Sequence, residues 1–212
     1  MTQFPIRRMR RLRRTPALRR LVQETHLVPS QLVWPLFAVH GEGVRREIAA
    51  LPGVYHTSVD ELVKDAERAQ QLGLGGVILF GIPQAKDATG SEAYDEQGIV
   101  QRAARALKRA VPQLLVIGDV CLCEYTDHGH CGVVQDGEVE NDASVYLLAK
   151  VAVSQARAGV DMVAPSGEPK RSLARRMRSR HDPAGFTITM SAPSSRSSWI
   201  SFIASSPLDA AI

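Results

Sequence analysis

The chain has 212 residues, of which 44% are hydrophobic and 23% are charged, as in a globular protein with a hydrophobic core. No apolar run is long enough to cross a bilayer, which argues against a membrane-spanning protein. The net charge is +4 and the N-terminus lacks the apolar stretch of a secretory signal, so we expect a cytoplasmic protein with reduced thiols.

A basic arm opens the chain. Residues 1–20 hold eight arginines and no acidic residue. Such a run fits an arm that lies against a neighbouring subunit, a mitochondrial presequence or a nucleic-acid-binding segment. Phe4 is the only aromatic residue among these twenty, so base stacking is poorly supported and nucleic acid is not an expected partner. We assign residues 1–30 to the arm, with a short helix from Thr15-Pro16 to about Glu24.

Apolar segments and helical patterns alternate between residues 31 and 166. Four apolar segments are predicted strands: residues 32–39, 76–81, 114–118 and 160–166. Three stretches with helical spacing lie between them: residues 58–73, 99–112 and 141–159. This alternation predicts an α/β fold with parallel strands, in which sites form where the strands end.

Local signals set the expected helix boundaries. Ser58 and Glu61 form a capping-box pattern, and Asn141 is a candidate cap for the last helix. Gly73 and Gly159 suit the ends of the first and last helices, because glycine readily takes the left-handed conformation found there.

All three cysteines lie within eleven residues, directly after the third predicted strand. Thiolates suit zinc, and three protein ligands with one open position describe a catalytic zinc site. Cys121 and Cys123 would point the same way on a strand, and Cys131 would fold back as the third ligand. We therefore predict a Zn²⁺ site made of Cys121, Cys123 and Cys131, with three idle reduced thiols as the alternative.

Two histidines, His128 and His130, lie in the same run. Either suits a metal ligand, a proton carrier or a polar loop residue, and the thiolates already supply three ligand positions.

The pattern changes after Ser166. Ten serines fall in the last 46 residues, against six in the 166 before them. No strand–helix unit is predicted there, so we interpret residues 167–212 as a divergent, irregular and poorly ordered tail. A barrel of eight strand–helix units needs about 250 residues, whereas residues 31–166 supply about four units.

Several segments resemble the 5-aminolaevulinate dehydratase (porphobilinogen synthase) family. They are Arg11-Leu12-Arg13-Arg14, Leu36-Phe37-Ala38-Val39-His40-Gly41, Leu51-Pro52-Gly53-Val54, Leu79-Phe80-Gly81-Ile82-Pro83, Lys86-Asp87, Gly90-Ser91, the run 119–132 and Val163-Ala164-Pro165-Ser166. The resemblance runs from near Arg11 to Ser166 and covers about the first half of the family's sequence. It implies a (β/α)8 TIM barrel, here about its first four units, with an arm that embraces a neighbouring subunit in a homo-octamer.

The resemblance also implies an activity. The family is a lyase (hydro-lyase) that condenses two molecules of 5-aminolaevulinate to porphobilinogen with loss of two waters, in haem and tetrapyrrole biosynthesis. In its zinc-dependent branch, cysteines matching Cys121, Cys123 and Cys131 hold the catalytic Zn²⁺. The resemblance places Asp119 beside the metal, where it assists proton transfer, and Ser166 at a further active-site position.

The lysines depart from the family pattern. The family forms Schiff bases through two lysines in its second half, and none of the five lysines here matches them: Lys64, Lys86, Lys108, Lys150 and Lys170. We therefore expect a sequence truncated or altered after Ser166, through a frameshift or a disrupted gene, with little or no activity. The alternative is a non-catalytic zinc-binding fragment that associates with full-length subunits through its arm.

Overall fold

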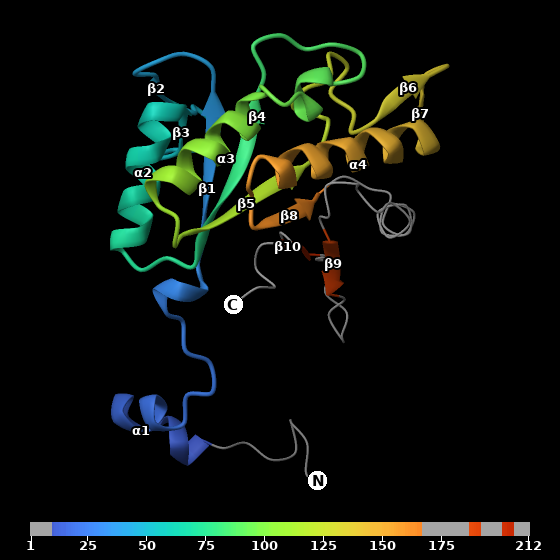
Figure 1. The fold of residues 1–212 in the computed structure, drawn as a ribbon. Helices are drawn as coiled ribbons and strands as arrows, with labels where there is room; N and C mark the ends of the chain where they lie inside the picture. The colour runs from blue at the N-terminus through green and yellow to red at the C-terminus, as the bar shows by residue number, and fades with distance from the viewer. Residues whose placement is uncertain (1–9, 167–186, 192–200, 206–212) are drawn as a thin grey trace.

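The structure, a computed structural model, describes residues 10–166, 187–191 and 201–205 (Figure 1). Eight strands form one sheet in the order β2-β3-β1-β4-β5-β8-β10-β9. No helix in the described ranges is long and apolar enough to cross a membrane.

Four parallel strands make up the centre of the sheet. They follow one another in chain order, and each pairs in parallel with the next: β1 (Val33–Val39), β4 (Gly76–Ile82), β5 (Leu115–Val120) and β8 (Met162–Pro165). Glycine-flanked apolar runs suit strands covered on both faces, and β5 is buried along almost its whole length. The predicted α/β fold with parallel strands is confirmed.

Three helices connect these strands and lie side by side along the sheet (Figure 1): α2 (Val59–Gln71), α3 (Ile99–Ala110) and α4 (Asn141–Arg157). Each turns an apolar stripe toward the strands, and Leu62, Leu107 and Leu148 are each 0% exposed. Burying each such leucine stabilises the fold by about 1.5–3 kcal/mol. This packing fixes the positions at which the strands end, and therefore the positions of the residues that follow them.

Shorter elements surround this body. Next to β1 lies the antiparallel pair of β2 (Arg45–Glu47) and β3 (Tyr55–Ser58), and β6 (Val133–Gln135) pairs with β7 (Glu138–Glu140) in a separate sheet. The remaining short helices are η1 (Arg10–Arg13), α1 (Pro16–Leu21), η2 (Pro29–Gln31) and η3 (Ser91–Tyr94). The segment with η1 and α1 extends away from the sheet (Figure 1), and Leu21 and Leu27 there are 79% and 74% exposed.

Two helix caps and one helix end differ from the predictions. Ser58 Oγ donates to Asp60 Oδ1 (2.6 Å) and accepts from Val44 N (2.9 Å), so no capping box forms with Glu61. The cap of α4 is Glu140, whose carboxylate accepts from the amides of residues 142 and 143, because β7 runs directly into the helix. Helix α1 ends at Leu21, three residues before the predicted end.

Part of the predicted tail lies outside the described residues. Where residues 167–212 are described, the structure has two strands that the sequence did not predict, β9 (Thr187–Ser191) and β10 (Ser201–Ser205). They pair with each other in antiparallel fashion, and β10 pairs with β8 in the same fashion. The central sheet therefore continues past β8 with antiparallel strands.

Candidate metal centre at the end of β5

The cysteines lie in a turn directly after β5. The strand ends at Val120, so Cys121 and Cys123 follow it rather than sit on it, and the prediction that they share one face of a strand is wrong. We name residues 121–131 the cysteine turn. The backbone reverses here, with the amides of Tyr125 and Thr126 both donating to Leu122 O at 2.9 Å. This tight reversal, rather than strand alternation, brings the thiols together.

Cys121 is the centre of the sulfur cluster. Its Sγ lies 3.1 Å from Cys123 Sγ and 3.0 Å from Cys131 Sγ, and the Leu122 amide donates to Cys131 Sγ at 3.3 Å. Cys121 is 5% exposed and the other two are partly buried. The structure thus brings together the three cysteines that the sequence singles out.

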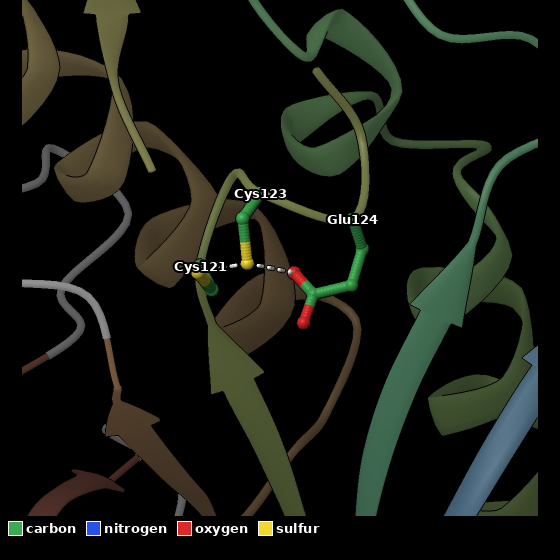
Figure 2. Close-up of side chains that lie close together, drawn as sticks. All are labelled: Cys121, Cys123 and Glu124. Carbon is green, nitrogen blue, oxygen red and sulfur yellow. Dashed lines mark hydrogen bonds between the residues drawn. The ribbon is translucent and has the colours of Figure 1, made fainter. Parts of the chain in front are cut away.

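A fourth side chain reaches this cluster. Glu124 turns its carboxylate toward the sulfurs (Figure 2) and accepts from Cys123 Sγ at 3.4 Å. Among the described residues, Cys121, Cys123 and Glu124 form the one group of three or more Cys, His, Asp or Glu side chains whose ligand atoms all lie within 4.8 Å of one another, and Cys131 joins them through its contact with Cys121. Sequence reasoning missed Glu124, although its place directly after the Cys-x-Cys pair was the available signal.

The thiols influence one another's protonation. The hydrogen bond between Cys121 and Cys131 holds the pKa of Cys121 down at about 6. Burial raises the pKa of Cys123, and the hydrogen bond with Cys121 raises the pKa of Cys131. The cluster therefore favours one thiolate, at Cys121.

The donor set fits zinc. With Zn–S bonds of about 2.3 Å, the sulfurs of a tetrahedral site lie about 3.8 Å apart. The separations of Cys121 Sγ from the other two sulfurs, 3.0 and 3.1 Å, are shorter by less than 1 Å, a difference that side-chain rotation can supply. Three thiolates with an oxygen donor also match the soft, borderline ligand set that zinc prefers.

Asp119 lies at the end of β5, with Ser166 close by. Asp119 is 8% exposed, and its carboxyl accepts a hydrogen bond from Ser166, the exposed residue that follows β8. Burial raises the pKa of Asp119 to about 7; the Ser166 hydrogen bond lowers it, and the charges of Glu124 and Cys121 raise it further. The two predicted polar residues therefore meet at the same edge of the sheet as the cysteines, because β5 and β8 are parallel neighbours.

A second loop is fastened to the cysteine turn. We name residues 83–90 the Asp87 loop. Asp87 N donates to Tyr125 O (3.2 Å), and Asp127 N donates to Asp87 O (3.1 Å). The carboxylate of Asp87 accepts from the backbone amides and hydroxyls of Thr89 and Ser91, and the Ser91 hydroxyl holds its pKa down at about 2.

The histidines lie where the cysteine turn contacts the Asp87 loop. His128 Nε2 lies 3.3 Å from Ala88 O, while its Nδ1 accepts from His130 N at 3.1 Å. The two rings stack with their centroids 5.6 Å apart. Within the described residues, the two histidines contact backbone groups and each other, so they act as loop residues.

The lysines lie elsewhere or are exposed. Lys64 pairs with Glu61 on the surface of α2, and Lys108 binds Asp161 at 2.8 Å. Lys150 lies over the rings of Tyr94 and Tyr146, and Lys86 is exposed in the Asp87 loop. Lys170 lies outside the described residues.

Comparison with known proteins places this geometry in context. The family model of delta-aminolevulinic acid dehydratase matches residues 6–191, a wider range than the motifs at 11–166 and one that includes part of the interpreted tail. The delta-aminolevulinic acid dehydratase of Halalkalibacterium halodurans is 50% identical over 181 residues, which are 85% of this chain and 55% of that protein. The one of Synechococcus elongatus is 50% identical over 190 residues, 88% and 58% of the two chains.

Further matches agree. A delta-aminolevulinic acid dehydratase from Ruminiclostridium josui is 46% identical over 86% of this chain and 88% of its own length. A crystal structure of the enzyme (porphobilinogen synthase) from Toxoplasma gondii, in complex with the reaction product porphobilinogen, has a TM-score of 0.75 at 36% identity. The match covers 83% of this chain and 52% of that one. The chain thus spans about half the length of this structure and of the first two relatives.

Proposed function

This chain belongs to the delta-aminolevulinic acid dehydratase family, and from this we propose that it forms the metal-binding half of a porphobilinogen synthase active site. The observation that carries the proposal is the convergence of three cysteine sulfurs at the carboxyl end of β5. In α/β folds with parallel strands, that edge is where active sites form.

The proposed reaction joins two molecules of 5-aminolaevulinate to give porphobilinogen with loss of two waters. Cys121, Cys123 and Cys131 would hold Zn²⁺. Bound Zn²⁺ would supply Lewis-acid chemistry, polarising a substrate oxygen. Glu124 lies next to the same sulfurs and would limit how many positions remain open.

Asp119 and Ser166 form the wall of the site beside the sulfurs. The Ser166 hydroxyl donates to the Asp119 carboxyl and would orient it. A substrate group held next to the sulfurs would then lie within reach of a positioned proton carrier. We assign Asp119 to proton transfer and Ser166 to its orientation.

The positions of the lysines limit the chemistry that this half-site can perform. Schiff-base chemistry needs an amine placed at the substrate and partly deprotonated. Lys64 and Lys108 hold carboxylate partners, and Lys150 lies against two tyrosine rings. We therefore propose that the chain alone binds metal but forms porphobilinogen very slowly.

The arm suits contact with a second subunit. Its exposed leucines would bury apolar surface against a neighbour, and its arginines would pair with acidic groups there. We propose homo-oligomer formation through residues 10–28, in line with the family resemblance.

Zinc titration of the full 212-residue chain, kept reduced and read against a competing chelator, tests the metal site. We expect one Zn²⁺ per chain. Cys121→Ser should cause the largest loss of affinity, because the Cys121 sulfur contacts both others, on the order of a hundredfold or more. His130→Ala is the matched control in the same turn and should stay within about threefold of wild type. Unchanged binding in Cys121→Ser would overturn the site.

A porphobilinogen assay tests the proposal that this chain forms only the metal-binding half of the site. The zinc-loaded chain should show almost no product from 5-aminolaevulinate. Adding a polypeptide that spans the second half of the Halalkalibacterium halodurans relative should raise the rate if the two halves assemble. Turnover by the chain alone at ordinary enzyme rates, about 1 per second or more, would contradict the half-site.

A further inference from the structure

Two buried glutamines stand out in the helices that cover the sheet. Gln101 on α3 and Gln155 on α4 are each 1% exposed. Within the described residues, their Oε1 atoms are the two buried side-chain polar atoms that lack a hydrogen-bond partner. A buried acceptor without a partner costs stability, and the amide nitrogens of the same side chains make the compensating interactions.

The amide of Gln101 joins helices. Its Nε2 donates to Ala93 O in η3 (2.8 Å) and to Ser154 Oγ on α4 (2.7 Å). Ser154 Oγ in turn donates to Val151 O, one turn earlier (3.1 Å). Gln101 therefore ties η3, α3 and α4 together on the outer side of the sheet.

The amide of Gln155 instead reaches the strand that leads to the cysteines. Its Nε2 donates to the backbone carbonyl of Asp119 at 2.7 Å. Beyond Gly118, β5 is no longer paired with β4, because the ladder between the two strands ends at this residue. On the other side of β5, Val120 lies opposite Pro165, which has no N–H to donate. Gln155 thus holds the backbone two residues before Cys121.

Gly118 makes room for this amide. A Cβ at position 118 would overlap Gln155 Oε1 and lie 2.9 Å from Gln155 Cδ. Any larger residue would push the Gln155 amide away from β5. Gly118 and Gln155 therefore act together: the glycine in the strand leaves the space through which the glutamine on the helix reaches β5.

We propose that Gln155 is a positioning residue for the cysteine turn: through the Asp119 carbonyl, it fixes the point at which the chain leaves β5 and so sets the spacing of the thiols. The inference rests on the proposed metal site for its function, although the positioning itself is a property of the metal-free chain. Gln101 has the same chemistry and burial but holds only helices. It is therefore the matched control.

The test compares Gln155→Met and Gln101→Met in the full chain by cobalt titration, which reports thiolate ligation through its charge-transfer absorption. Both variants should lose thermal stability to a similar degree. Only Gln155→Met should lower Co²⁺ affinity, by about tenfold to a hundredfold, as is typical for partners that orient metal ligands. Equal affinity in the two variants would overturn the proposal.

A metal-free readout separates this proposal from the proposed function. The Leu122 amide donates to Cys131 Sγ, and the Tyr125 and Thr126 amides donate to Leu122 O. Hydrogen exchange at these three amides should quicken at least tenfold in Gln155→Met and stay near wild type in Gln101→Met. Unchanged exchange in Gln155→Met would overturn the positioning role, whereas failure of wild type to bind Co²⁺ would overturn the metal site alone.

Gly118→Ala provides a second variant if Gln155→Met does not fold. It leaves the glutamine in place and displaces its amide from the strand side. We expect the same faster exchange at Leu122, Tyr125 and Thr126. A folded Gly118→Ala chain with wild-type exchange at all three amides would count against the joint role of Gly118 and Gln155 in positioning the cysteine turn.

Discussion

The Asp87 loop and the cysteine turn lie side by side at one edge of the sheet, yet they are ordered in different ways. The Asp87 carboxylate accepts from two backbone amides and two hydroxyls, which belong to Thr89 in the loop and to Ser91 at the start of η3. The thiols of the cysteine turn bond mainly to one another, and the buried carboxyl of Asp119 has its pKa raised to about 7. The Asp87 loop, whose carboxylate already has its hydrogen-bond partners, thus supports the cysteine turn, whose thiols are better suited to binding a cation.

The contrast shows where structural and functional polar groups differ. Hydrogen bonds to a carboxylate stabilise its charged form and lower its pKa, whereas burial among other acidic groups raises it. Both situations occur within one edge of this sheet. Perturbed groups of the second kind gather at functional sites, in agreement with the proposed metal centre.

The largest expected effect comes from the packing under the cysteine turn. A Cβ at Gly81 would overlap the hydroxyl of Tyr125 and lie 2.7 Å from Val100 Cγ2. Since Tyr125 is 5% exposed and has little room to move, Gly81→Ala should destabilise the chain by about 2–3 kcal/mol in a urea unfolding experiment. Adding Tyr125→Phe removes the hydroxyl and should recover part of the lost stability. No loss in Gly81→Ala would show that the turn is not packed against β4.

Removing the charge of Asp87 should have a smaller effect. Asp87→Asn leaves one carbonyl oxygen for four donors, and we expect a loss of about 1–2 kcal/mol, reduced from the buried case because the loop is partly exposed. Hydrogen exchange at Thr89 and Ser91 should quicken. Asp95→Asn is the matched control and should cost less, because within the described residues the Asp95 carboxylate accepts a single hydrogen bond, from Gln97 N at 2.6 Å. Equal losses would mean that the Asp87 bonds do not order the loop.

The smallest effect is a pH dependence of the Asp87 loop. The folded pKa of Asp87, about 2, lies below the ordinary value of 3.8, so its contribution to stability is fully present above about pH 4. That contribution should be lost as the pH falls from about 4 through 2. The difference in stability between wild type and Asp87→Asn, measured across this range, should shrink toward zero. A difference that stays constant down to pH 2 would contradict the lowered pKa.

Periodicity and composition were enough for the framework. The alternation of apolar runs and helical patterns predicted β1, β4, β5 and β8 and the three connecting helices, because each pattern matches the repeat of its element. The spacing of three cysteines after a strand also identified the candidate centre. Element type and ligand spacing are local properties, so they can be predicted from short stretches of sequence.

Local signals failed where two elements compete for one residue. Glu140 caps α4 in place of Asn141 because β7 runs straight into the helix, and Ser58 uses its hydroxyl for Val44 and Asp60. The backbone conformation just after β5 was likewise not predictable from the sequence, so Cys121 and Cys123 were expected to point the same way, as on a strand, and not to lie in a tight turn. Boundaries of this kind depend on neighbours that are distant in sequence.

Sequence patterns were enough to predict the fold class, the family and the cysteine ligands of the candidate metal centre. The packing of the chain decided that Cys121 is central to the cluster, that Glu124 faces it and that Ser166 reaches Asp119. It also decided that Gln155, 36 residues along the chain from Asp119, holds that residue's carbonyl. Element type follows from the repeat of the chain itself, whereas the partner of a buried polar group is chosen by whatever the packed helices and strands bring within about 3 Å.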